Sequence, residues 1–261
     1  MIGFGTWKLT DINELRTALS AAVEAGYGVI DTAAVYCNEI SIGKALRELV
    51  INRDDVFIQS KLWITDMGFS KAQEACKRAL RKLKLNHLDA YFIHWPSSTD
   101  EDLNRETFAG LQKLKRDGLI KFAGVSNFKP HHIETLETSP DINQIEFHPG
   151  FMQSEIVKFC RERNISLQAH SPLGNGEILQ NPTLTEISRI HAKTIAQICL
   201  RWIIEKNITP IVKSSDPKRI KENADIFDFA LGDEARKIDA LEFCGGLGLD
   251  SDEVINFDQL R

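Results

Sequence analysis

The chain has 261 residues, and 32 lysines and arginines against 37 aspartates and glutamates give it a formal net charge of −5. A content of 43% apolar and 26% charged residues is typical of a globular protein and excludes a disordered or fibrous chain. The acidic balance argues against a general nucleic-acid surface, which needs many lysines and arginines, and no apolar run approaches the ~18 residues of a membrane span.

The amino terminus and the cysteines indicate where the protein works. The sequence does not open with a basic region followed by an apolar stretch, so we expect no signal peptide. The five cysteines are scattered and form no CxxC pair: Cys37, Cys76, Cys160, Cys199 and Cys244. This use of cysteine suits the reducing cytoplasm, and neither a disulfide framework nor a structural metal site is expected.

Short β-rich runs alternate with helical patterns along the chain. The runs begin near Ile2, Val29, Val56, Leu88, Ile120, Asn143, Ser166 and Thr209. Between them, apolar residues recur at intervals of three and four, first from Ile12 to Val23 with Gly26 as a stop, and then within residues 72–83, 108–114, 156–160 and 195–203. Successive strands start 23 to 43 residues apart, which leaves room for one crossover helix each.

Eight strands, each with room for a following helix, predict an α/β fold of the (β/α)₈ TIM-barrel type, with residues 1–261 as a single domain. The competing architecture is a doubly wound open sheet. That fold usually shows a glycine fingerprint after its first strand when it binds a dinucleotide, and none is present here. The Gly-rich, acidic residues 245–261 are expected to lie over one barrel mouth or to form a frayed end.

In this fold the active site lies at the carboxyl ends of the strands. Each predicted strand ends in polar or aromatic residues: Thr6 and Trp7, Asp31, Lys61, His94, Ser126 and Asn127, Gln144 and Glu146, His170 and Ser171, and Lys213 and Ser214. Barrel mouths face solvent and are often polar, which accounts for any one of these residues. Solvent exposure explains less well why an acid, a lysine and a histidine end three consecutive strands.

Three of these positions, together with Tyr36 in a loop, suggest acid–base chemistry on a carbonyl oxygen. Tyr36 follows the strand-end Asp31 by five residues, and its hydroxyl can act as a general acid if its anion is stabilised. Lys61 offers an ammonium that favours the phenolate, and Asp31 would hold that ammonium charged and oriented. His94 adds a donor where a substrate oxygen would lie.

Two further groups of residues complete the expected site. Trp7, Trp63 and Trp95 lie at or near strand ends and are expected to wall a substrate pocket. Four positive charges fall within nine residues at the last strand end and the start of a helix, at Lys213, Lys218, Arg219 and Lys221. Helix amino termini and guanidinium groups both suit phosphate.

Six segments in order along the chain resemble the aldo-keto reductase superfamily. They are Gly3-Phe4-Gly5-Thr6-Trp7, Ile30-Asp31-Thr32-Ala33 with Tyr36, Ser60-Lys61-Leu62-Trp63, Ile93-His94-Trp95-Pro96, Gly124-Val125-Ser126-Asn127-Phe128 and Asn143-Gln144-Ile145-Glu146-Phe147-His148-Pro149. The resemblance implies NADPH-dependent reduction of aldehydes and ketones on a (β/α)₈ barrel. It also implies that Tyr36 is the proton donor of a catalytic tetrad with Asp31, Lys61 and His94.

The same resemblance implies a set of cofactor-binding residues. Ser126, Asn127 and Gln144 would hold the nicotinamide carboxamide, with Thr6 and His170 also in contact with the cofactor. Ser171, Leu173 and Gly174 would line the pyrophosphate. Lys213, Ser214 and Arg219 would hold the adenosine 2′-phosphate, and Asn223 would lie near the adenine.

Three features depart from the family pattern. The chain begins within its first strand, without the hairpin that closes the barrel bottom in relatives, so we expect a truncated start. His170 occupies a position where the family usually has a stacking aromatic, and a tyrosine there would offer a larger face to the nicotinamide. The short loops at residues 97–104 and 176–182, together with the closing residues 245–252, favour the bacterial 2,5-diketo-gluconate reductase type.

Two other functions remain open on the sequence alone. A metal-dependent barrel hydrolase would use His94, His148, His170, Asp31 and Glu146 as ligands, but no strand carries a His-x-His pair and Lys61 would repel a cation. A binding or cofactor-sensing barrel with slow activity is the other alternative. The leading hypothesis is a cytoplasmic, monomeric carbonyl reductase that binds no metal, nucleic acid or membrane.

Overall fold

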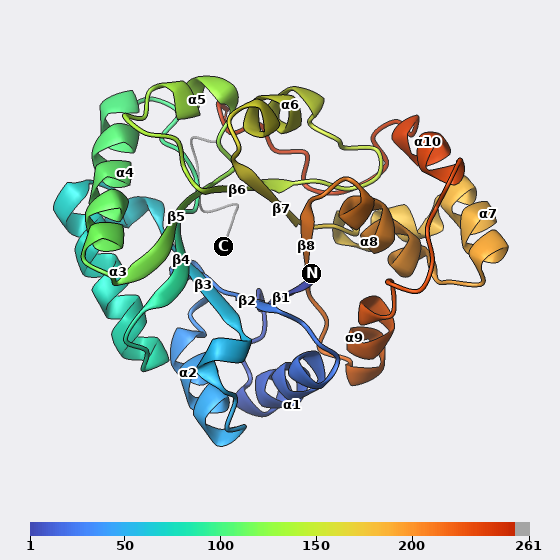
Figure 1. The fold of residues 1–261 in the computed structure, drawn as a ribbon, viewed down its shortest axis with the longest axis horizontal. Coiled ribbons are helices and arrows are strands. Elements are labelled where there is room, and N and C mark those ends of the chain that lie inside the picture. Colours follow the sequence, from blue (N-terminus) through green and yellow to red (C-terminus); the bar gives the residue numbers. More distant parts are fainter. Residues whose placement is uncertain (254–261) are drawn as a thin grey trace.

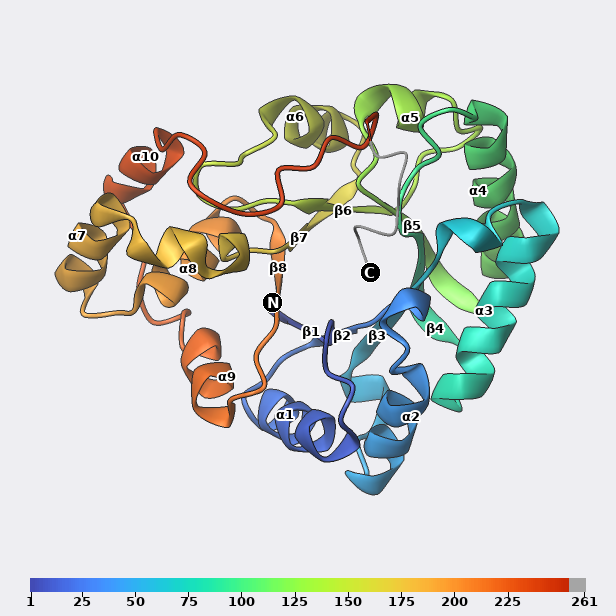
Figure 2. The same cartoon turned by 180° about the vertical axis from the view of Figure 1, so that it is seen from behind.

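Eight parallel strands pair in chain order, and β8 closes the ring on β1 (Figures 1 and 2). This computed structural model describes residues 1–253. The strands are β1 (Gly3–Gly5), β2 (Val29–Asp31), β3 (Phe57–Leu62), β4 (Leu88–Ile93), β5 (Ile120–Ser126), β6 (Ile142–Glu146), β7 (Ser166–His170) and β8 (Thr209–Val212). Each starts within one residue of its predicted position, and the (β/α)₈ barrel is confirmed.

Helices surround the strands as an outer ring (Figure 1). They are α1 (Ile12–Glu24), α2 (Glu39–Glu48), α3 (Phe69–Leu83), α4 (Glu101–Arg116), α5 (Pro130–Glu134), α6 (Ser154–Glu162), α7 (Pro182–His191), α8 (Ile195–Glu205), α9 (Pro217–Ala224) and α10 (Glu234–Asp239). The α1 helix begins where predicted because the Asp11 carboxylate accepts from the N–H groups of Asn13 and Glu14. The predicted apolar periodicities coincide with α1, α3, α4, α6 and α8, and they missed α2, α5, α7, α9 and α10. In α7 only Leu184 and Ile187 are buried, too few residues for a period to be visible.

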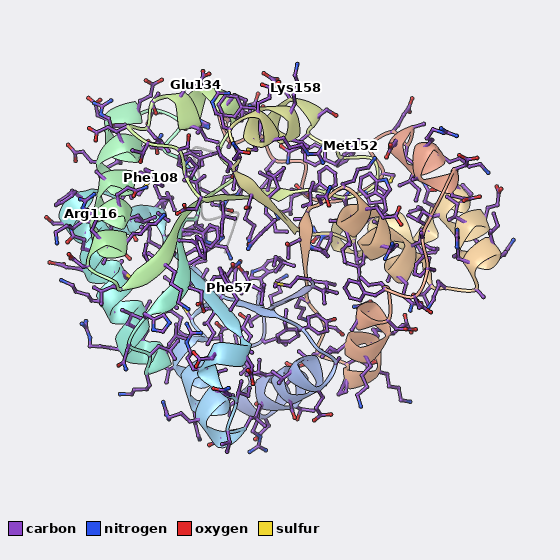
Figure 3. The ribbon with its side chains drawn as sticks, viewed as in Figure 1. Phe57, Phe108, Arg116, Glu134, Met152 and Lys158 are labelled. Atoms are coloured by element: carbon purple, nitrogen blue, oxygen red, sulfur yellow. The ribbon has the colours of Figure 1, made fainter. Side chains whose placement is uncertain are left out.

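Strand residues alternate between the helices and the barrel interior. In β3, Ile58 and Leu62 pack in the main core, whereas Phe57 packs in a separate small cluster with Ala90, Phe92 and Ile142. Figure 3 shows side chains filling the ring of strands, with Phe57 labelled among them. The lower interior is therefore apolar, as in other barrels of this type.

The middle of the interior is polar instead. Gln59 of β3 and Gln168 of β7 hydrogen-bond to each other, although these two strands are not neighbours, so their side chains meet across the barrel. Branched apolar residues usually fill this layer. The glutamines lie directly beneath the strand ends where the site was predicted.

The helices of residues 1–253 include none long and apolar enough to cross a bilayer.

Candidate active site

The four residues of the predicted tetrad come together at the carboxyl ends of β2, β3 and β4. Asp31 ends β2, Lys61 lies one residue before the end of β3, and His94 directly follows β4. Tyr36 ends the short 3₁₀ helix η1 (Ala34–Tyr36) that follows β2. Register between consecutive parallel strands therefore places side chains from distant parts of the chain at one edge.

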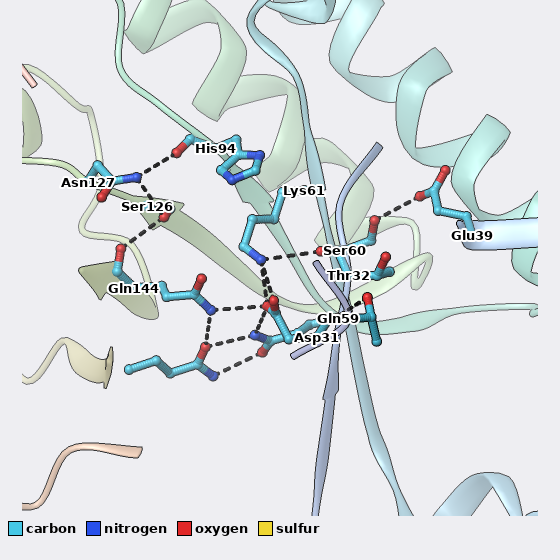
Figure 4. Close-up of polar contacts among 12 residues, drawn as sticks. Asp31, Thr32, Glu39, Gln59, Ser60, Lys61, His94, Ser126, Asn127 and Gln144 are labelled. Carbon is cyan, nitrogen blue, oxygen red and sulfur yellow. Dashed lines mark hydrogen bonds and ion pairs between the residues drawn. The ribbon is translucent and has the colours of Figure 1, made fainter. Parts of the chain in front are cut away.

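A buried ion pair forms the centre of this group. Lys61 Nζ lies 2.6 Å from Asp31 Oδ1 and 2.7 Å from Asp31 Oδ2, and it also donates to Thr32 O at 3.3 Å (Figure 4). The Tyr36 ring centroid is 5.5 Å from Lys61 Nζ and 5.7 Å from the His94 ring centroid. The phenol, the ammonium and the imidazole thus surround one small volume.

Burial determines the protonation of these groups. Burial first, and the Asp31 charge second, raise the pKa of Tyr36 well above 10. Burial, together with the charges of Lys61 and His170, holds the pKa of His94 well below 6.5. Burial also lowers the pKa of Lys61, against the opposing charge and hydrogen bonds of Asp31. Near pH 7 the site therefore offers a protonated phenol and a neutral imidazole.

This result corrects one step of the sequence argument. That argument expected the Lys61 ammonium to favour the Tyr36 phenolate. The net direction is the opposite, because burial of the phenol and the nearby Asp31 carboxylate both oppose ionisation. A general acid must carry its proton before the reaction, so the observed direction suits that role.

A cavity of about 400 Å³ opens above the ion pair. Thirteen of the predicted site residues line it: Trp7, Asp31, Tyr36, Trp63, His94, Trp95, Asn127, Gln144, His170, Ser171, Leu173, Lys213 and Arg219. The sequence analysis singled out none of Gly5, Asn175, Gly176, Leu179, Ile211, Val212 and Leu247 as site residues, but these also line the cavity. They are glycine, asparagine or aliphatic residues, which carry little chemical signal in a sequence.

The remaining predicted residues lie behind or beside this cavity. Thr6 is buried and donates from its hydroxyl to Asp31 O at 2.9 Å, which anchors the end of β2. Lys61 lies beneath the floor, and Ser126 donates to Gln144 O at 2.9 Å. Asn223 is buried beside Tyr27. Gly174 and Ser214 adjoin the lining residues Leu173 and Lys213 in the chain.

His170 makes a hydrogen bond that the sequence did not reveal. Its Nε2 lies 2.8 Å from Asn127 Oδ1 and its Nδ1 lies 3.2 Å from Ser171 Oγ. Because an amide oxygen only accepts, we assign the neutral tautomer that carries its proton on Nε2. Burial lowers the pKa of His170 to about 4, so this tautomer persists at neutral pH. His170 therefore orients Asn127 in addition to offering a ring face.

This bond changes the expected effect of substitution at position 170. Stacking area alone favours tyrosine, but His170→Phe keeps a ring face and leaves Asn127 Oδ1 without its donor. We expect a two- to tenfold increase in the Kd for NADPH, the size of one neutral hydrogen bond, at ~0.5–1.5 kcal/mol. Fluorescence titration of wild type and the variant measures it. Tighter binding by His170→Phe would show that stacking dominates.

The segment after α10 runs along the β7 and β6 side of the barrel mouth, close to one of the two expected arrangements (Figure 2). The Glu146 carboxylate accepts from the N–H groups of Leu247 at 2.6 Å and Gly248 at 2.9 Å, and Leu247 lines the cavity. A β-carbon at Gly246 would collide with Glu146 and His148, so glycine is required there. Of the predicted closing segment, residues 254–261 lie outside the described residues.

Within the described part of the chain, the side chains at the barrel mouth do not form a group of three possible metal ligands. Among residues 1–253, one group of three histidine, cysteine or acidic side chains has ligand atoms close together, and it consists of His131, His132 and Asp252, away from the cavity. Lys129 Nζ already lies 2.6 Å from Asp252 Oδ2, where it would repel a cation. The five ligands of the hydrolase alternative include none of that group.

The closed barrel and the buried lysine–aspartate pair beneath a mouth cavity define a (β/α)₈-barrel enzyme. Residues 1–242 match the aldo/keto reductase family, and the chain belongs to that family. It is therefore an NAD(P)H-dependent oxidoreductase that acts on carbonyl groups.

Named relatives and solved structures support this membership over nearly the whole chain. A glyoxal reductase of Bacillus subtilis is 42% identical over 97% of this chain and 92% of its own length. A 9,11-endoperoxide prostaglandin H2 reductase of Trypanosoma cruzi is 40% identical over 96% of this chain and 90% of its own length. The crystal structure of an aldo-keto reductase from a Medee basin deep-sea metagenome library has a TM-score of 0.93 at 36% identity. The match covers 98% of this chain and 96% of that one.

A Bombyx mori aldo-keto reductase crystallised in complex with NADP has a TM-score of 0.84 at 34% identity, over 91% of this chain and 87% of that one. The 2,5-diketo-gluconate reductase type stays a prediction.

Proposed function

We propose that this protein reduces small aldehydes and ketones to alcohols with NADPH, using Tyr36 as the proton donor. The observation that carries the proposal is the protonated, half-buried Tyr36 beside the Lys61–Asp31 pair and a neutral His94 at the base of a cavity. The Bombyx mori relative was crystallised with NADP. The five cysteines, all free thiols, are consistent with the cytoplasm, and we propose one domain acting as a monomer.

The cavity residues fit a dinucleotide phosphate. Lys213 and Arg219 line the cavity together with Asn127, Gln144 and His170. The cations suit a phosphate, and the two amides suit a carboxamide. No described residue donates to Gln144 Oε1, so an acceptor is left for a bound N–H group. The bound nicotinamide would supply the hydride.

The protein's own side chains would supply the proton and the positive charge that stabilises the resulting phenolate. As hydride reaches the carbonyl carbon, negative charge develops on its oxygen, and the Tyr36 hydroxyl donates its proton there. The Lys61 ammonium stabilises the phenolate that remains, and Asp31 keeps that ammonium in place. His94 lies against both Tyr36 and Trp63 and would orient the carbonyl oxygen as a neutral hydrogen-bond donor.

Arg219 is expected to carry much of a preference for NADPH over NADH. Its side chain is 77% exposed at the cavity edge, and Asp216 Oδ2 is 3.9 Å from its Nε. Asp216 also caps α9 by accepting from Lys218 N at 2.9 Å, so its charge is partly engaged there. Arg219→Ala should raise the Kd for NADPH roughly tenfold, since a charge-assisted bond to phosphate is lost. Fluorescence quenching measures it.

NADH has no phosphate at this position, so its Kd should change by less than about twofold. Lys218→Ala, a neighbouring cation that does not line the cavity, is the matched control. Equal losses for both cofactors would place Arg219 away from the phosphate.

The function itself is tested by NADPH oxidation against glyoxal, methylglyoxal, simple aldehydes, ketoses and keto acids. Glyoxal enters this set because of the name of the Bacillus subtilis relative. We expect saturable turnover with at least one small aldehyde. Tight NADPH binding without turnover on any member of the panel would favour the cofactor-sensing alternative.

A further inference from the structure

Three buried glutamines surround the Asp31 carboxylate from below. Gln59, Gln144 and Gln168 are 0%, 2% and 6% exposed, and neither Gln59 nor Gln168 lines the cavity. Buried amides are unfavourable unless they are hydrogen-bonded. An apolar layer is the usual solution at this depth of a barrel, so a hydrogen-bonded amide cluster beneath Lys61 and Asp31 needs a functional reason.

The hydrogen bonds of the cluster converge on one oxygen atom. Asp31 Oδ1 accepts from Gln59 Nε2 at 2.6 Å, Gln144 Nε2 at 3.1 Å and Lys61 Nζ at 2.6 Å (Figure 4). Only the ionised carboxylate can accept freely from three donors and still meet Lys61 with Oδ2. Asp31 is thereby held against rotation by groups on two other strands, β3 and β6.

The carboxylate also determines which way each amide faces. Gln59 and Gln144 must turn their nitrogens toward it, and the second N–H of each goes to Gln168 Oε1, at 2.8 Å and 2.9 Å. Gln168 Nε2 returns a bond to Gln59 Oε1 at 2.9 Å. A reversed Gln144 would face two acceptor oxygens, so its own oxygen is the one left for the cavity.

We infer that Gln59 and Gln168 are positioning residues, which hold the Asp31 carboxylate toward Lys61 and fix the Gln144 amide with its oxygen available to the nicotinamide carboxamide. This inference rests on the proposed function. Neither residue touches substrate or cofactor. They act through Asp31 and Gln144, and their effect should therefore be confined to the nicotinamide end of the cofactor and to turnover.

Replacing Gln59 and replacing Gln168 by glutamate should have unequal effects on turnover and cofactor binding. The neutral carboxyl group of Gln168→Glu reproduces all three bonds, because its O–H donates to Gln59 Oε1 and its carbonyl accepts from Gln59 and Gln144. The carboxyl group of Gln59→Glu cannot replace the native amide in any protonation state, because Gln59 Nε2 donates two bonds and a carboxyl group has at most one proton. A purely structural layer would show this difference in the melting temperature alone, without a separate effect on the nicotinamide end of the cofactor.

The experiment compares Gln59→Glu, Gln59→Leu and Gln168→Glu with wild type. The measurements are kcat, the Kd for NADPH, the Kd for 2′-phospho-ADP-ribose, which lacks nicotinamide, and the melting temperature. Both Gln59 variants should lose about ten- to a hundredfold in kcat, the size of a hydrogen bond to a charged group. Their Kd for NADPH should rise about three- to tenfold while that for 2′-phospho-ADP-ribose stays within about twofold.

The Gln168→Glu variant should lose less than about threefold in kcat at acidic pH. It should lose more as the pH rises, because the ionised carboxylate of this variant would face Gln59 Oε1. Equal losses in all three variants, or equal shifts of the two dissociation constants, would reduce the glutamines to packing and overturn the inference. Absence of turnover in wild type would instead overturn the proposed function, while the two dissociation constants would still test the positioning role.

Discussion

Tyr36→Phe is expected to lower carbonyl reduction by about 10²–10⁴-fold, the usual contribution of a general acid. The phenol is half-buried and protonated, and its ring centroid lies 5.5 Å from Lys61 Nζ. Phenylalanine keeps the ring and its edge contact with His94 and removes only the proton donor. The loss should fall on kcat, because the proton is needed only as the alkoxide forms.

The binding of NADPH should change little in this variant, by less than about threefold. Single-turnover rates with saturating NADPH, together with fluorescence titration of the cofactor, separate the two effects. The control is Tyr27→Phe, which removes a different buried hydroxyl, one that donates to Ile220 O. A Tyr36→Phe enzyme with wild-type turnover would refute the assignment of the proton donor.

The strands, and the proximity of Asp31, Tyr36, Lys61 and His94, could be predicted from the sequence for a simple reason. The strands begin in short, near-continuous apolar runs, and the barrel brings the carboxyl ends of consecutive strands to one edge. An aspartate, a lysine and a histidine at the ends of β2, β3 and β4 had therefore to lie close together. The structure brings Tyr36 to the same place, because η1 follows β2 directly.

The supporting contacts could not be predicted, because they join positions far apart in the chain. Gln59 and Gln168 are separated by 109 residues, and Glu146 and Leu247 by 101. One signal was available for the first pair, since each glutamine occupies an inward strand position that is usually apolar. No local pattern indicates that His170 donates to Asn127, because that bond depends on the left-handed backbone of Asn127, at φ 63°.

Lys61→Met is expected to reduce turnover at least as much as Tyr36→Phe. The substitution leaves the Asp31 carboxylate buried with only the Gln59 and Gln144 amides as side-chain donors. An uncompensated buried charge typically destabilises a protein by ~3–5 kcal/mol, so the melting temperature should also fall. The Asp31 charge already raises the pKa of Tyr36, and without the ammonium beside it that pKa should rise further.

A second variant separates folding from chemistry in this prediction. Lys61→Met combined with Asp31→Asn removes both charges, and the side-chain oxygen of the introduced asparagine can still accept from Gln59 and Gln144. We expect the double variant to regain most of the melting temperature, because no unpaired charge remains in the barrel. It should stay as inactive as Lys61→Met, since nothing then stabilises the phenolate that Tyr36 becomes on giving up its proton. Turnover of the double variant near the wild-type value, measured on folded protein with saturating NADPH, would show that the ion pair maintains the barrel and takes no part in proton transfer.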